Sequence, residues 1–214
     1  MSIFQKRQTR YSKKTPKFGI GFPKTVSEDH ELDKMNGNTL WGDEISKENN
    51  NVEIAFDIMP DEELVLNGYK HIRYQMIFDV KIEDFRRNAI LVADGNMEKT
   101  PKFQTYYIVI SCDTVRLALT ISALNDFQIK AGYIMNSYVT APTAKKVWTV
   151  LGNQWGANAG NKAIIVHALY GLKNYGADLR KHLDDCMIHV GYKPCPDDLD
   201  RCIKPEVDTG GNIY

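Results

Sequence analysis

Side chains that could do chemistry, Asn136, Ser137 and Tyr138, follow an apolar stretch in the second half of the chain. The residues before them, Phe127–Ile134, are apolar at alternate positions, which predicts a buried β-strand that leads into a polar loop. Loops at the ends of strands often carry binding and catalytic residues. The pattern therefore predicts a reaction centre within Phe127–Pro142.

Helices and strands on both sides must hold this loop in place. Before it, the run Thr114–Leu124 is apolar on most sides and predicts a core helix. After it, Val147–Val150 and Ala163–Leu169 are rich in β-forming residues. The helix predicted over Gly176–Val190 places apolar residues at spacings of three and four, which indicates a buried face. That face consists of Leu179, Leu183, Cys186, Met187 and Val190.

The first half of the chain predicts two helices and three strands. Thr25 and Glu28 form a capping-box pattern before a helix that Asn36-Gly37 should end. A second helix is expected over Leu40–Lys47. Alternating apolar residues then predict three strands, over Val52–Met59, His71–Val80 and Phe85–Ala93.

This order of segments, with Leu-Tyr-Gly-Leu-Lys at Leu169–Lys173, resembles the reverse transcriptase of copia-type retrotransposons, an RNA-directed DNA polymerase. The resemblance covers the chain from roughly Lys17 to its last residue. It implies an α+β, partial right-hand polymerase fold. An antiparallel fingers sheet would contain the three early strands, and an incomplete palm sheet packed on helices would contain the strand over Phe127–Tyr133.

Composition and the resemblance together divide the chain into four parts. A basic, disordered tail is expected over residues 1–16, and connector helices with the first strand over 17–60. The fingers-like region and the first palm helix should follow over 61–126. Residues 127–214 should form a partial palm that contains the equivalents of the family's motifs A and B.

Motif A of the family reads approximately Ala-Asp-Ile-x-Asn-Ala-Tyr-Leu-x-Ala-Pro, and its aspartate holds two magnesium ions. The matching residues here are Gly132–Pro142, with Tyr133 in the place of the aspartate. Magnesium prefers hard anionic oxygens, and a phenol, with a reference pKa of about 10, is a poor substitute. The second metal-binding motif, Tyr-Val-Asp-Asp, does not occur in the sequence. The resemblance thus implies a polymerase by descent that is catalytically inactive, with no bound metal or other cofactor.

A second departure lies in the predicted fingers. The family's strand reads approximately Phe-Arg-Arg-Lys-Ala-Arg, and its lysine and last arginine reach the triphosphate. Here Asn88 and Ile90 replace these two cations, whereas Arg86 and Arg87 remain. The residues that the resemblance assigns to nucleotide binding are Tyr138, Asn136, Arg86 and Arg87. Those that it assigns to template contact are Gly171, Lys173 and Gly176.

Charge is balanced overall, with 27 Lys and Arg against 27 Asp and Glu. This balance argues against a uniformly basic nucleic-acid surface, although the first 24 residues contain cations and no acids. The resemblance implies an RNA or DNA template-primer as partner, bound weakly. No apolar run reaches the roughly 20 residues of a membrane helix. We therefore expect an intracellular protein, cytoplasmic or nuclear, that does not bind membranes.

Two alternatives remain open at this point. The chain could be a non-catalytic module that binds nucleic acid or another protein. His182, Cys186 and His189 also fall on one face of a predicted helix and could suggest a zinc site. The resemblance supplies the same pattern in a packing helix, so no zinc is expected.

Overall fold

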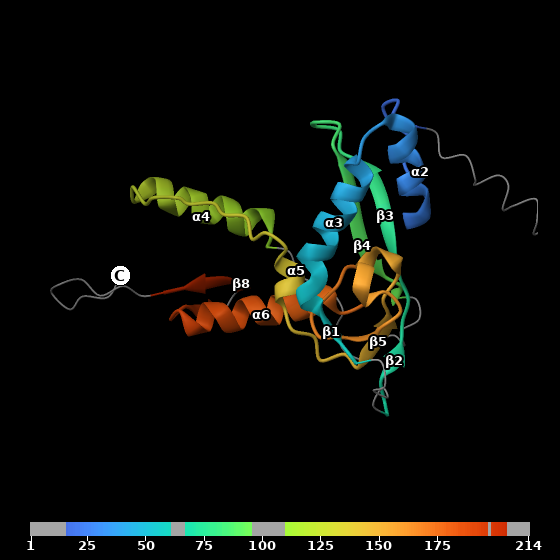
Figure 1. Ribbon diagram of the computed structural model, residues 1–214. Helices are drawn as coiled ribbons and strands as arrows, with labels where there is room; N and C mark the ends of the chain where they lie inside the picture. Colours follow the sequence, from blue (N-terminus) through green and yellow to red (C-terminus); the bar gives the residue numbers. More distant parts are fainter. Residues whose placement is uncertain (1–15, 61–66, 96–109, 197, 205–214) are drawn as a thin grey trace, which may run out of the picture.

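The computed structural model describes residues 16–60, 67–95, 110–196 and 198–204. Helices and small sheets both contribute to the described residues, so the fold is α+β, as the sequence predicts (Figure 1). The basic tail predicted over residues 1–16 lies outside the described residues, apart from Pro16.

The first described helix, α2 (Val26–Asn36), has the predicted boundaries. Thr25 occupies the N-cap position, and the carboxylate of Glu28 accepts a hydrogen bond from the backbone N–H of Lys24 at 2.7 Å. Gly37 ends the helix with a φ of 65°. This left-handed conformation favours glycine, so the Asn-Gly signal has a physical basis.

The second helix is longer than predicted, and the first strand is shorter. Helix α3 spans Leu40–Val52 and continues through a single turn, η1 (Glu53–Ala55), into β1 (Phe56–Ile58). The predicted strand over Val52–Met59 is therefore wrong in its first half. The helix continues because Asn49 is buried and donates its side-chain N–H to the carbonyl of Gln154 at 2.8 Å.

Strands β3 (Tyr74–Val80) and β4 (Arg87–Ala93) form the predicted antiparallel hairpin, with Tyr74 opposite Ala93 and Val80 opposite Arg87. Met76, Phe78 and Val80 are buried as their alternation predicts. The first predicted strand does not join this hairpin, which corrects the expected three-stranded fingers sheet. Helix α3 instead packs against β4 (Figure 1).

A separate four-stranded sheet has the order β1-β6-β5-β2. Its members after β1 are β2 (Lys70–His71), β5 (Val147–Val150) and β6 (Lys162–Ile165). Strand β1 pairs antiparallel with β6, with Phe56 opposite Ile165, and β2 pairs parallel with β5. The sheet thus joins strands from three of the expected parts of the chain: β1 from residues 17–60, β2 from 61–126, and β5 and β6 from 127–214.

The predicted palm strand is wrong. Phe127–Tyr133 has no regular secondary structure, and the side chains of Phe127 and Ile129 are 61% and 60% exposed. A strand needs a neighbour for its backbone hydrogen bonds, and no strand of the described residues pairs with this segment. The alternation of apolar residues does not indicate whether a neighbouring strand is available for pairing.

The helix before this segment is also not the expected core helix. Helix α4 (Cys112–Leu124) buries none of its residues, and it extends away from the two sheets (Figure 1). Leu117, Leu119 and Leu124 are exposed. The apolar sequence predicted the helix correctly. Its predicted burial is wrong, because no other element of the described residues covers it.

Helix α6 (Tyr175–His189) matches the predicted helix, and the hairpin of β7 (Lys193–Cys195) and β8 (Asp198–Ile203) follows it. The predicted buried face of α6 is only partly covered. Gly176 is its one buried residue, whereas Cys186 and Val190 are exposed. The first turn of α6 meets the short helix α5 (Ser137–Thr140), but the described residues leave its last turns open.

The hydrophobic core lies where α3, the β3-β4 hairpin and the four-stranded sheet meet. Trp41 of α3 is fully buried and meets Phe78 edge to face, with 5.7 Å between ring centroids. No helix of the described residues is long and apolar enough to cross a membrane.

Asp33 connects α2 to the start of α3 and provides a test of this packing. Its buried carboxylate accepts the backbone N–H groups of Trp41 at 3.0 Å and Gly42 at 2.9 Å. We expect Asp33→Ala to lower the free energy of unfolding by about 1–3 kcal/mol, because these donors lose their acceptor. Urea titration would measure the loss. Glu31→Ala, an exposed site on the same helix, should change stability by less than about 0.5 kcal/mol, and an equal loss in both variants would contradict this role.

Candidate nucleic-acid interface

The second half of the predicted motif A is firmly anchored, unlike its first half. Asn136 adopts a left-handed conformation with a φ of 53° and precedes α5. Val139 of α5 is buried. The carbonyl of Ala141 accepts the N–H of Ala168 at 2.8 Å, and an isolated bridge joins Pro142 to His167. The loop that carries Tyr138 is therefore fixed to the residues after β6.

The Leu169–Lys173 turn, the predicted motif B, packs directly against the end of β4. The N–H of Ala93 donates to the carbonyl of Tyr170 at 2.7 Å. Gly171 has a φ of 91°, and a Cβ built there would overlap the carbonyl oxygen of Ala93. A Cβ on Gly95 would likewise overlap the carbonyl oxygen of Gly171. Backbone contact between β4 and the turn thus requires glycine at both positions.

Packing of the loop and α5 against the Leu169–Lys173 turn and the first turn of α6 brings three tyrosines together. Tyr138 lies 5.2 Å from Tyr170 and 4.8 Å from Tyr175, measured between ring centroids. Tyr170 and Tyr175 are 6.4 Å apart. Tyr170 is 37% exposed and the other two rings are half-buried. We call Tyr138, Tyr170 and Tyr175 the tyrosine cluster.

Tyr170 presents a neutral ring within the cluster. Burial raises the pKa of the Tyr170 phenol above its usual range, and the nearby Glu48 carboxylate and neighbouring phenols raise it further. Its hydroxyl therefore stays protonated at neutral pH. Partly exposed aromatic rings of this kind can stack against nucleic-acid bases.

The other predicted contact residues are not all at this cluster. Arg87 begins β4 and Ala93 ends it, so the two lie about 20 Å apart along the strand. Arg87 sits over the Trp41 ring at 5.7 Å, and Arg86 pairs with Asp84 at 3.6 Å. The structure therefore does not bring Arg86 or Arg87 to the tyrosine cluster.

The three residues that the resemblance assigns to template contact differ in how exposed they are. Gly171 is exposed, Lys173 is half-buried, and Gly176 is buried in the first turn of α6. Lys173 is adjacent to the cluster in sequence and carries a positive charge that suits a phosphate. Gly176 has no exposed surface with which to touch a ligand.

The residues present do not fit the pair of magnesium ions that the resemblance implies. Tyr133, at the position of the family's aspartate, is 89% exposed in an irregular segment. Across residues 16–60, 67–95, 110–196 and 198–204, no three His, Cys, Asp or Glu side chains form a group that could hold a metal. His182 and Cys186 do approach each other at 3.8 Å, as their helical spacing predicts. No step can be derived through bound magnesium.

Comparison with known proteins adds no match to this geometry. No family model, curated protein or solved structure matches the chain.

Sequence reasoning missed Glu48, which lies beside the tyrosine cluster. Its carboxylate accepts the backbone N–H of Leu91 in β4 at 2.9 Å. Burial raises the pKa of this carboxyl above its usual range, although the hydrogen bond from Leu91 opposes the shift. The predicted helix ends at Lys47, one residue before Glu48, whereas α3 continues to Val52.

The raised pKa of Glu48 predicts how this residue affects stability. The folded chain holds the proton at pH values where the unfolded chain releases it, so the contribution of Glu48 to stability falls as pH rises through that window. Glu48→Gln keeps an acceptor for Leu91 and removes the buried charge. The melting temperature of this variant, relative to that of the unmodified chain, should therefore increase between about pH 4 and pH 7.

Comparison of Glu48→Ala with Glu48→Gln separates the effect of the hydrogen bond from that of the charge, because alanine removes both and glutamine removes only the charge. Glu48→Ala leaves the Leu91 N–H without its acceptor and should cost about 1–3 kcal/mol. If Glu48→Gln destabilised the fold as much as Glu48→Ala at pH 7, the charge would be favourable and this reading would be wrong.

Proposed function

We propose that the chain is a reverse-transcriptase-like domain of a copia-type retrotransposon polyprotein, one that binds nucleic acid without polymerase chemistry. The observation that carries the proposal is the meeting of three segments that are distant in sequence. The Leu169–Lys173 turn contacts the end of β4 through backbone atoms, and the ring of its Tyr170 contacts the ring of Tyr138 in the loop. The loop and the turn are segments that the resemblance assigns to nucleotide and template contact, whereas the arginines that it assigns to the fingers, Arg86 and Arg87, lie at the opposite end of the hairpin strand.

The tyrosine cluster supplies the binding surface in this proposal. Base stacking on an aromatic ring is worth about 1–3 kcal/mol per base and tolerates every base, because each has a flat face. Lys173 adds a positive charge for a backbone phosphate. The interaction should therefore be weak and independent of sequence.

The absence of polymerase chemistry in this proposal is supported by the residues at the positions where the family binds the nucleotide triphosphate. Asn88 and Ile90 replace the cations of the family's finger strand, and Asn88 lies opposite Asp79 in the hairpin. Asp94 adds a further negative charge near the end of β4. A triphosphate needs cations at such positions, so these residues favour binding of a strand over binding of an incoming nucleotide.

Titration of a labelled RNA–DNA hybrid at low and moderate salt tests the proposal. We expect weak binding at low salt whose affinity falls steeply as salt increases, because phosphate contacts release counterions. Deletion of Met1–Pro16 should weaken binding and flatten the salt slope, since this tail is basic. Lys173→Ala should reduce the slope of log affinity against log salt concentration by about one, because one phosphate contact is lost.

Two outcomes would contradict the proposal. Absence of binding even at low salt would leave a fold without nucleic-acid function. Tight binding that ignores salt would show that phosphate contacts are not its basis.

A further inference from the structure

The rings of the tyrosine cluster are inclined to one another. The angle between ring planes is 63° for Tyr138 and Tyr170, 52° for Tyr138 and Tyr175, and 50° for Tyr170 and Tyr175. No two of these rings are parallel, so a base is not sandwiched between two of them. A base must instead lie on an outward face, and Tyr170, at 37% exposed, is the most exposed of the three.

A fourth tyrosine lies beside the cluster. Tyr133 is 89% exposed and belongs to the segment before the loop with Tyr138. Burial is the main cause of the raised pKa of Tyr170, and the nearby groups that raise it further include the Tyr133 phenol. The Tyr133 ring is therefore near Tyr170 and open to solvent. An exposed ring in this position is a second surface on which a base can stack.

Bases inside a duplex have no free face for such rings. Each is stacked on its neighbours, and extruding one costs free energy of the same order as stacking on a protein ring returns. The bases of a single strand can be splayed out and stacked on aromatic side chains. A blunt duplex offers a free base face only at its ends. The exposed rings thus match an unpaired base better than a paired one.

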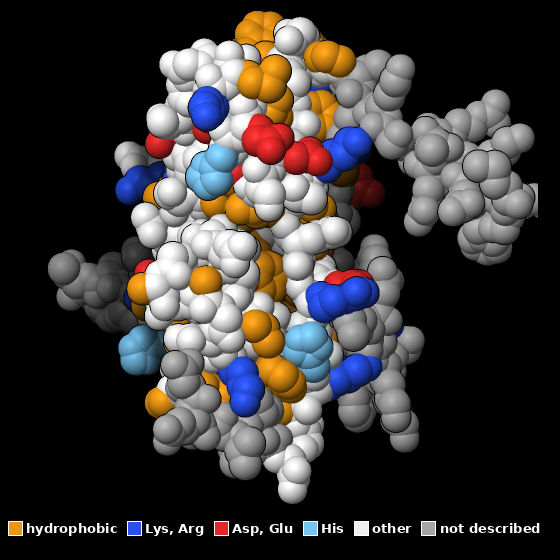
Figure 2. All heavy atoms as spheres, turned by 45° about the vertical axis from the view of Figure 1, so that its right-hand side comes forward, with side chains coloured by type: hydrophobic (Ala, Val, Ile, Leu, Met, Phe, Trp, Pro, Cys, Tyr) orange, Lys and Arg blue, Asp and Glu red, His pale blue; other side chains and the backbone are white. Residues whose placement is uncertain are grey.

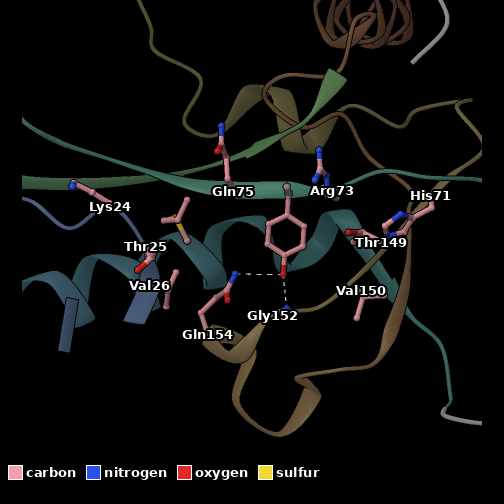
Figure 3. Close-up of a pocket in the computed structure, with 12 residues that line it drawn as sticks. Lys24, Thr25, Val26, His71, Arg73, Gln75, Thr149, Val150, Gly152 and Gln154 are labelled. Atoms are coloured by element: carbon pink, nitrogen blue, oxygen red, sulfur yellow. Dashed lines mark hydrogen bonds between the residues drawn. The ribbon is translucent and has the colours of Figure 1, made fainter. Parts of the chain in front are cut away.

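Charges of both signs surround the cluster. At the end of β4, Arg73 pairs with Asp94 at 3.3 Å, and Figure 3 shows the Arg73 side chain on the side of β3 away from the turn after β5. Glu48 lies near Tyr170, and Lys173 belongs to the same turn as Tyr170. A duplex carries the phosphates of two strands, and this balanced set of charges does not offset them. A single strand needs fewer cations.

The face that carries α2, β3 and β2 shows no continuous basic stripe among its described residues. That side of Figure 1 comes forward in Figure 2, where Lys and Arg side chains are scattered among hydrophobic and neutral ones. Acidic side chains also lie on this face. A stripe of cations is the usual electrostatic footprint on a protein that binds nucleic acid through phosphates. The scattered cations favour recognition through bases.

We propose that the tyrosine cluster, together with Tyr133, binds an unpaired base of a single nucleic-acid strand. Tyr170 and Tyr133 supply the stacking faces, and Tyr138 and Tyr175 pack against the Tyr170 ring. Tyr133 is then a binding residue at the position where the family has a metal ligand. The inference rests on the nucleic-acid binding proposed above and names its substrate, a single strand of RNA or DNA. An RNA–DNA hybrid binds more weakly, through its terminal bases.

Fluorescence anisotropy of the full chain with labelled probes of one length tests this inference. The probes are a single DNA strand, a strand of abasic sugars with the same phosphates, and the DNA strand in a blunt RNA–DNA hybrid. At low salt the single strand should bind about fivefold or more tightly than either other probe, because it alone offers unpaired bases along its length. Equal affinity for the single strand and the abasic strand would overturn the inference and leave phosphate binding intact. Loss of binding to all probes would overturn the proposed function as well.

A single RNA strand of the same sequence distinguishes the two kinds of strand. It should bind with an affinity similar to that of the DNA strand, because the bases and not the sugars are contacted. Binding of the RNA strand alone would refute recognition through the base, since the 2′-hydroxyl would then be the recognised group.

Variants test the contribution of the Tyr133 ring. Tyr133→Leu should weaken binding of the single strand about fivefold or more, and Tyr133→Phe, which keeps a ring, should bind like the unmodified chain. Phe127→Leu is the matched control. Its ring is 61% exposed in the same irregular segment, but its N–H donates to the carbonyl of Ser122 near the end of α4. This variant should also bind like the unmodified chain.

Both substituted positions are exposed, so the melting temperatures of all three variants should stay within a few degrees of that of the unmodified chain. Equal affinity of Tyr133→Leu and the unmodified chain would refute the role of Tyr133. Equal weakening by Phe127→Leu would refute it too, because the effect would then belong to the whole segment.

Discussion

Given primer-template, nucleotides and magnesium, the purified chain should extend no primer. A metal-borne stabilisation of several kcal/mol corresponds to at least about a thousandfold in rate, and no group of three His, Cys, Asp or Glu side chains in the described part of the chain could hold such a metal. Tyr133 stands at the position of the metal-binding aspartate in the family's motif A, and the sequence contains no Tyr-Val-Asp-Asp. A gel-based extension assay with a radiolabelled primer would measure the activity, with an active reverse transcriptase as its positive control.

Tyr133→Asp makes this prediction sharper. The substitution returns one carboxylate to a position that is 89% exposed and lies outside any strand. One exposed carboxylate cannot hold two magnesium ions, so we expect no gain of extension. Template-dependent extension by the unmodified chain would contradict the account of its chemistry.

Gly171→Ala should disrupt the fold. Its φ of 91° strains any side chain, and the added Cβ would overlap the carbonyl oxygen of Ala93, which is backbone and cannot rotate away. Backbone strain of about 1–3 kcal/mol and overpacking of about 1–3 kcal/mol together predict a loss of about 2–6 kcal/mol. A loss of this size approaches the whole stability of many domains.

Gly160→Ala is the matched control. Gly160 has a φ of 89°, close to that of Gly171, but an added Cβ would meet no atom within 4 Å. It should therefore lose only the strain, about 1–3 kcal/mol. Thermal melting of both variants separates close packing from backbone conformation, and equal losses would show that the contact between β4 and the turn is unimportant.

Local patterns predicted the elements that depend on local physics. The hairpin of β3 and β4, the stop at Gly37 and helix α6 follow from alternation, turn chemistry and helical spacing. Gly171 was expected only as a template contact, and the structure shows that the backbone it closely approaches is the end of β4. The tyrosine cluster arises where the Leu169–Lys173 turn and the start of α6 meet the loop with Tyr138.

Predictions that required a partner element were the ones that differed. The segment Phe127–Tyr133 alternates like a strand, but a strand forms only with a neighbour. Helix α4 is apolar, but its burial depends on what covers it. The pairing of β1 with β6 joins residues more than 100 positions apart, and short-range periodicity carries no record of that separation.

The tyrosine cluster is the central claim, and one binding measurement tests it directly. In the hybrid titration at low salt, Tyr138→Leu keeps an apolar side chain but removes the ring, so affinity should fall about 5- to 100-fold. Tyr192→Leu, which changes a tyrosine after α6 outside the cluster, should bind like the unmodified chain. Equal affinity of Tyr138→Leu and the unmodified chain, with both folded, would contradict the assignment of nucleic-acid binding to this cluster.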